Sequence, residues 1–192
     1  INFEIIWDGQ KIFYPLILDE IIHKFKSNDK YKYLVIPIGI ELENGAHSNI
    51  LFYDKKSNEI ERFEPNGGSY PFKFNYNPKL LNILVKDKFQ TFFPDCIYKV
   101  PSDFLPKIGF QLLESYDHYK TKKIGDPGGF CAVWCLWYIN MRIKYNVLDR
   151  NKLVIKLIQK IREENIQFKT LIRNYAKKVI DMRDEILVES NI

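Results

Sequence analysis

The chain has 192 residues, of which 46% are apolar and 15% aromatic, and its formal net charge is +5. This composition excludes a disordered chain and is sufficient for one sizeable core. The longest apolar run, 130–139, is too short to cross a bilayer, and no signal peptide is apparent at the start, so we expect no membrane partner. The positive excess lies in residues 142–192, which we interpret as a solvated helix face rather than a surface for nucleic acid.

The first half of the chain alternates between helical and strand patterns. Apolar spacing predicts a helix over 15–27. Residues 33–40 predict a strand in which Pro37 favours an edge or a bulge. Residues 49–53 and 59–63 predict two strands joined as a hairpin. The segment 65–77, rich in Pro, Gly and Asn, predicts a loop.

The second half is mainly helical. Pro78 is typical of a first helical turn and predicts a helix to about Phe89. Short strands are expected at 96–100 and 108–113, and a loop at 120–129. A central helix is expected over 130–145, followed by two helices within 151–188 that are interrupted near 163–167. We therefore predict an α+β fold with an antiparallel sheet.

The stretch GDPGGFCAVW, residues 125–134, places a cysteine at the start of the central helix. Gly128 and Gly129 permit a sharp turn and the close approach of another chain, so Gly129 is a candidate substrate-binding residue. Free N–H groups at a helix N-terminus stabilise a thiolate and can bind an oxyanion, which makes Cys131 a candidate nucleophile. We interpret Cys135 as a core residue. With Cys96 as the third cysteine, neither a disulfide framework nor a zinc site is expected.

A cysteine nucleophile needs a base, and His47 is the best of the three histidines. It enters the strand at 49–53 directly after a Gly turn, whereas His23 lies in a predicted helix and His118 in a polar loop. If Asp54 pairs with Glu59, Glu64 becomes the diagonal neighbour of His47 on the same face of the sheet. A shift of the register by one residue would place Glu61 there instead.

The order His47, Glu64, Cys131 resembles that of the Ulp1/adenain-like cysteine proteases, which include SUMO proteases and viral maturation proteases. The segments HSNILFYDKKSNEIERFEP and GDPGGFCAVWCLWY look most similar to thiol proteases of large DNA viruses. The resemblance implies a papain-like or Ulp1-like fold in which a buried helix carries the nucleophile and further helices lie at the C-terminus. It implies one protease domain over 1–192, with a catalytic core at 1–145 and a helical part at 146–192.

The chain departs from the pattern of that family in three places. Its acid is Glu where Asp is commoner, and Phe130 occupies the place of an Asp that usually precedes the cysteine. The Gln that completes the oxyanion hole is absent from its usual place a few residues before the cysteine. Gln111 is our candidate for that role, and Asp126 is the alternative.

The resemblance also implies a function: a thiol protease that cleaves after Gly-Gly, acting as a deubiquitinase or on a ubiquitin-like protein. Trp7 would clamp the Gly-Gly tail, and the alternative, which we favour, is that it anchors a terminal strand. Neither a metal nor a cofactor is expected, and free thiols favour the host cytosol or a virion. The alternatives are a viral polyprotein-processing protease, a His-Glu-Cys acetyltransferase that uses acetyl-CoA, and a non-enzymatic scaffold.

Overall fold

The computed structural model describes residues 3–69, 74–116 and 129–190. Within these residues the chain forms six strands and seven helices. The strands are β1 (Ile5–Asp8), β2 (Lys11–Phe13), β3 (Tyr33–Leu42), β4 (Gly45–Asp54), β5 (Glu59–Phe63) and β6 (Ile97–Lys99). The helices are α1 (Leu18–Lys26), α2 (Pro78–Phe92), α3 (Pro101–Phe104), α4 (Phe110–Tyr116), α5 (Cys131–Lys144), α6 (Arg150–Glu163) and α7 (Phe168–Glu189).

The strands form one sheet in the order β2-β1-β3-β4-β5-β6. The pairs β1–β2, β3–β4 and β4–β5 are antiparallel, whereas β1–β3 and β5–β6 are parallel. The α+β class is thus observed, but the sheet is mixed rather than antiparallel. Parallel pairs need a long crossover, and these are supplied here by the segments that contain α1 and α2.

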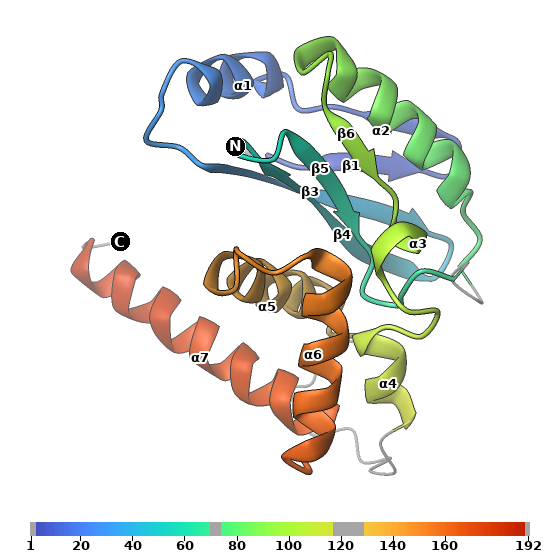
Figure 1. Ribbon diagram of the computed structural model, residues 1–192, viewed down its shortest axis with the longest axis vertical. Coiled ribbons are helices and arrows are strands. Elements are labelled where there is room, and N and C mark those ends of the chain that lie inside the picture. The colour runs from blue at the N-terminus through green and yellow to red at the C-terminus, as the bar shows by residue number, and fades with distance from the viewer. Residues whose placement is uncertain (1–2, 70–73, 117–128, 191–192) are drawn as a thin grey trace.

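Helices cover both faces of the sheet, as Figure 1 shows: α1 and α2 lie on one side and α5, α6 and α7 on the other. Each face has its own hydrophobic cluster. Ile36 and Leu51 belong to the cluster under α1 and α2, whereas Ile50 and Phe63 belong to the cluster under α5, α6 and α7. Strand residues alternate between the two faces, so a nearly continuous apolar run such as that of β4 fits a sheet buried on both sides.

Local chemistry explains where several elements begin. Asn77 caps α2, because its side chain accepts from the N–H groups of Lys79 and Leu80, and Pro78 follows at the first helical position. Pro37 lies in β3 just before the first residue that pairs with β1, so its missing N–H removes no hydrogen bond on that side. Asn58, with φ of 51°, turns the chain between β4 and β5.

The structure corrects one predicted strand and adds an N-terminal hairpin. Residues 108–113, expected to be a strand, instead lead into α4. Gly67 and Gly109 explain the difference: a Cβ on Gly67, whose φ is +111°, would lie 2.5 Å from the backbone nitrogen of Gly109. The backbone N–H groups of Gly109 and Gln111 donate to the carbonyls of Asn66 and Pro65, so this segment pairs with the loop after β5 and not with a strand. The β1–β2 hairpin was not among the predicted elements.

Candidate active site

Three predicted site residues meet at one end of the sheet. His47 is the third residue of β4, Glu64 follows the last residue of β5, and Cys131 is the first residue of α5. Asp54 pairs with Glu59, so the register that the sequence analysis required is observed. Because β4 begins where β5 ends, this register brings His47 and Glu64 to the same edge.

His47 and Glu64 form a buried pair. The two side chains are 1% and 2% exposed, and Nε2 of His47 lies 2.6 Å from Oε1 of Glu64. A carboxylate can only accept, so Nε2 donates and the tautomer of the ring is fixed. The Phe74 ring lies against the imidazole with a centroid separation of 4.7 Å, which restricts its rotation.

Glu64 has further partners that hold it as an anion. Its Oε1 accepts from the backbone N–H of Asn66 at 2.9 Å, and its Oε2 accepts from Asn49 at 2.9 Å and from Tyr76 at 3.1 Å. Burial by itself raises the pKa of Glu64, but the charge and hydrogen bond of His47 outweigh it and the pKa is lowered. Arg62, 4.0 Å away, acts in the same direction.

Cys131 is the third residue of this group. Its thiol hydrogen-bonds to the imidazole of His47, and since Nε2 is engaged by Glu64, Nδ1 is the nitrogen left for the sulfur. Burial raises the pKa of Cys131, but His47 and hydrogen bonds from Ser48 outweigh it, so the pKa lies below its usual value. The cysteine is partly exposed, as a nucleophile must be.

The pKa of His47 moves in the opposite sense. Burial lowers it, but the charge of Glu64 and the hydrogen bonds to Cys131 and Glu64 raise the pKa to about 9. A raised imidazole pKa beside a lowered thiol pKa favours a thiolate–imidazolium pair near neutral pH. Such a pair is the reactive form of a cysteine nucleophile.

The other two cysteines differ from Cys131, as expected for Cys135. Cys135, one turn further along α5, is buried, and burial followed by the charge of Glu64 raises its pKa well above the usual value. Burial likewise raises the pKa of Cys96. All three cysteines are free.

Gln111 also lies beside the site. It is in α4, its backbone N–H donates to the carbonyl of Pro65 at 3.0 Å, and its side chain points at Gly129. A Cβ built on Gly129 would lie 3.5 Å from Nε2 of Gln111. Within the described residues Oε1 of Gln111 is buried without a hydrogen-bond partner. Gln111 thus lies beside Gly129, which precedes the nucleophile by two residues in the sequence.

Other predicted residues lie elsewhere or outside the described residues. Trp7 is fully buried in the cluster under α1 and α2, where it pairs with Ile40, so it anchors β1 and is not placed to clamp a substrate. His23 is an exposed residue of α1. His118 and Asp126 lie outside the described residues, so the choice between Gln111 and Asp126 stays a prediction.

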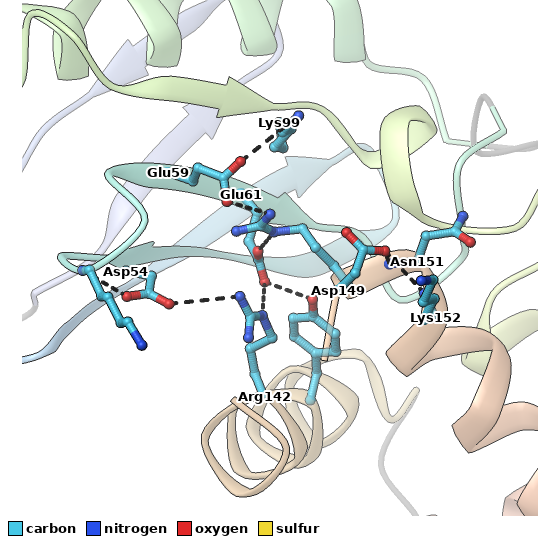
Figure 2. Close-up of polar contacts among 11 residues, drawn as sticks. Asp54, Glu59, Glu61, Lys99, Arg142, Asp149, Asn151 and Lys152 are labelled. Carbon is cyan, nitrogen blue, oxygen red and sulfur yellow. Dashed lines mark hydrogen bonds and ion pairs between the residues drawn. The ribbon is translucent and has the colours of Figure 1, made fainter. Parts of the chain in front are cut away.

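Glu61, interpreted as a surface charge if it did not orient His47, is instead buried with 0% exposure. It accepts hydrogen bonds from Tyr138 at 2.7 Å, from Arg142 at 3.1 Å and from Arg150. Figure 2 shows this cluster between β5 and α5, with Asp54 and Glu59 at its margins. Sequence reasoning missed it, because the charged residues of β5 (EIERF) are typical of an exposed strand and do not reveal which of them is buried.

Neither a metal-binding group nor a membrane-spanning helix is found among the described residues. Among residues 3–69, 74–116 and 129–190, no three His, Cys, Asp or Glu side chains are grouped to share a metal ion. In the same residues, no helix has both the length and the apolarity needed to cross a membrane.

Comparison with known proteins gives two viral relatives. No family model matches the chain. A protein of Acanthamoeba polyphaga mimivirus, provisionally named ankyrin repeat protein L371, is 44% identical over 198 aligned residues, which cover all of this chain and 26% of the relative. The chain thus spans about a quarter of that protein. The uncharacterized protein 082L of Invertebrate iridescent virus 6 is 44% identical over 50 residues, which cover 25% of this chain and 31% of the relative.

These comparisons overturn the predicted family and function. The full-length match is to a protein named for ankyrin repeats, and no protease family is found, so the assignment to the Ulp1/adenain-like proteases is wrong. The functions predicted from that family are wrong as well: Gly-Gly protease, deubiquitinase, polyprotein protease and acetyltransferase. The error came from three short motifs in a common order, which carry far less information than similarity along a whole chain. The Ulp1-like form of the fold stays an untested prediction.

Proposed function

We propose that this protein is a thiol-dependent hydrolase of acyl compounds, with Cys131 as nucleophile, His47 as acid and base, and Glu64 as the residue that orients His47. These three residues define a reaction class, whichever acyl compound is the substrate.

One observation carries the proposal: a buried imidazole bridges a buried carboxylate and the only cysteine of the three whose pKa is lowered. Burying charged groups is costly, and here the buried pair ends on a partly exposed thiol at the start of a helix. Perturbed titratable groups at the partly exposed N-terminus of a helix are typical of a reactive site.

The chemistry follows from the positions of these atoms. The Cys131 thiolate attacks the acyl carbon, a carbon–sulfur bond forms, and the leaving group departs with a proton from His47. Water then attacks the thioester while His47 takes its proton, and the carbon–sulfur bond breaks to release the carboxylic acid. The N–H of Cys131, which has no intrahelical partner at this position, and Nε2 of Gln111 would stabilise the oxyanion.

An aryl ester tests the proposal without knowledge of the natural substrate. We expect p-nitrophenyl acetate to give a burst of p-nitrophenol and one acetyl group on Cys131, located by peptide mass spectrometry. His47→Ala should slow this acylation roughly a hundredfold, because base catalysis is lost.

The matched controls are one variant that removes a different thiol and one that removes the proposed nucleophile. Cys96→Ala should acylate like the wild type, and Cys131→Ala should show no burst. Acylation of Cys96 or of lysines at the rate seen for Cys131, or a burst that survives Cys131→Ala, would overturn the proposal.

A further inference from the structure

We propose that Ser48 distinguishes the two cysteines of α5: its N–H and hydroxyl donate to the sulfur of Cys131, whereas its carbonyl accepts the S–H of Cys135. This inference rests on the proposed function, because it concerns how the nucleophile is prepared. Ser48 was not among the residues expected from the sequence.

Ser48 contacts the sulfur atoms of both cysteines. Cys131 and Cys135 are four residues apart on α5 and therefore lie on the same face of the helix, one turn apart. That face lies against β4, where Sγ of Cys135 is 3.5 Å from the carbonyl oxygen of Ser48. Both the backbone and the side chain of Ser48 hydrogen-bond to Cys131.

The polarity of each contact determines which proton state it favours. A carbonyl oxygen can only accept, so its contact with Cys135 requires the S–H and holds that cysteine as a thiol. An N–H or O–H donor is satisfied best by an anion, so the contacts with Cys131 favour the thiolate. One residue of β4 thereby favours opposite protonation states in two cysteines a helical turn apart.

The neighbouring titratable groups act in the same sense. His47 on β4 faces Cys131 and lowers its pKa. Burial raises the pKa of Cys135, and the charges of Glu64 and Cys131 raise it further. Ser48 adds to these charges a pair of donors directed at one sulfur and an acceptor directed at the other.

Removing only the hydroxyl tests the role of Ser48. We expect Ser48→Ala to slow the labelling of Cys131 by iodoacetamide about tenfold below pH 7, as for loss of a hydrogen bond to a charged group. The rate should recover at alkaline pH, where the thiol ionises without help. Ser48→Thr, which keeps the hydroxyl and suits a strand, should restore the wild-type pH profile.

Three results separate the possibilities. A Ser48→Ala profile that superimposes on that of the wild type would overturn the role of the hydroxyl while Cys131 still acylates, which leaves the proposed function standing. Labelling of Cys135 in the folded chain as fast as Cys131 would overturn the discrimination between them. If Cys131 of the wild type labels like an ordinary cysteine and does not acylate, the proposed function fails first.

Discussion

Glu64 is a buried carboxylate, and a full set of donors offsets the cost of its burial. His47, Asn49, Tyr76 and the N–H of Asn66 all donate to it. Carboxylates held in this way stay ionised, and the anion in turn keeps the imidazole charged. The reactivity of Cys131 therefore depends on a residue that it does not touch.

Replacing the Glu64 carboxylate with a neutral amide should lower the reactivity of the Cys131 thiol. We expect Glu64→Gln to slow the iodoacetamide labelling of Cys131 at pH 7 tenfold or more, because His47 without its anion no longer stays protonated. Glu41→Gln, the same change at an exposed position of β3, is the matched control and should label like the wild type. Equal rates for the wild type and Glu64→Gln would show that the pair does not activate the cysteine.

The same carboxylate should also contribute to acid stability. Its pKa is lower in the folded state than its usual 4.5, so around that pH the unfolded chain binds more protons and stability falls as acid is added. This contribution is present above pH 4.5 and is lost as the pH drops through the pKa of the folded state. Urea unfolding from pH 6 to pH 3 should therefore show a steeper loss of free energy in the wild type than in Glu64→Gln. Parallel curves would contradict the prediction.

Some site residues were predictable from the sequence because their relation is local. The pairing of two antiparallel strands limited the partner of His47 to Glu64 or Glu61, and the observed register selects Glu64. Ser48 was not predictable, because its role depends on which face of α5 meets β4. Gln111 could be named as an oxyanion-hole candidate, but its position beside Gly129 could not be predicted, since it depends on the close contact of two glycine-containing loops.

At the level of elements, β5 and α5 are joined at two places. The cluster around Glu61 joins β5 to Tyr138 and Arg142 of α5 and to Arg150 of α6. The Phe63 ring stacks on Tyr138 with centroids 4.0 Å apart. Because α5 also carries Cys131, this cluster fixes the helix in the position at which its first residue meets His47.

Breaking that cluster should cost far more stability than breaking a surface ion pair. Arg150 is 7% exposed and bonds to Glu61 and Glu59, so Arg150→Met should lower the free energy of unfolding by about 3 kcal/mol. Arg183→Met removes an exposed ion pair with Asp184 on α7. This change should alter the free energy of unfolding by under about 0.5 kcal/mol. Urea unfolding of both variants measures the two changes in the free energy of unfolding. Equal changes would mean that the buried cluster does not stabilise the packing of α5 and α6 on β5.

Most elements were predictable because their patterns are regular. The hairpin of β4 and β5 and the helices α1, α2, α5, α6 and α7 follow from periodicity and capping. The segment before α4 was mistaken for a strand because an apolar run of that length is ambiguous without its tertiary partners. The parallel pairing of β1 with β3 and of β5 with β6 depends on how the crossovers pack, which no local pattern records.

In the whole molecule, the site lies at the end of a sheet whose two faces carry separate hydrophobic clusters. The far end of α7 extends away from this body (Figure 1), and residues 181–190 are all exposed. The buried residues of α7, Phe168 and Ile172, lie in its first two turns.

This arrangement predicts that the end of α7 is dispensable for the site. Ending the chain after Asp181 should leave the labelling of Cys131 unchanged and alter the free energy of unfolding by under about 1 kcal/mol. Thermal and urea unfolding provide the measurement. A loss of several kcal/mol would show that these turns pack against the body after all.

The thiolate–imidazolium pair is tested most directly by titrating the His47 imidazole by NMR, with its signal assigned from His47→Gln. We expect this ring to keep its proton until about pH 9, and we expect Cys131→Ala to lower this pKa because the thiolate partner is gone. A ring that loses its proton near pH 6.5 in the wild type, with no response to Cys131→Ala, would contradict the pairing on which the proposed chemistry depends.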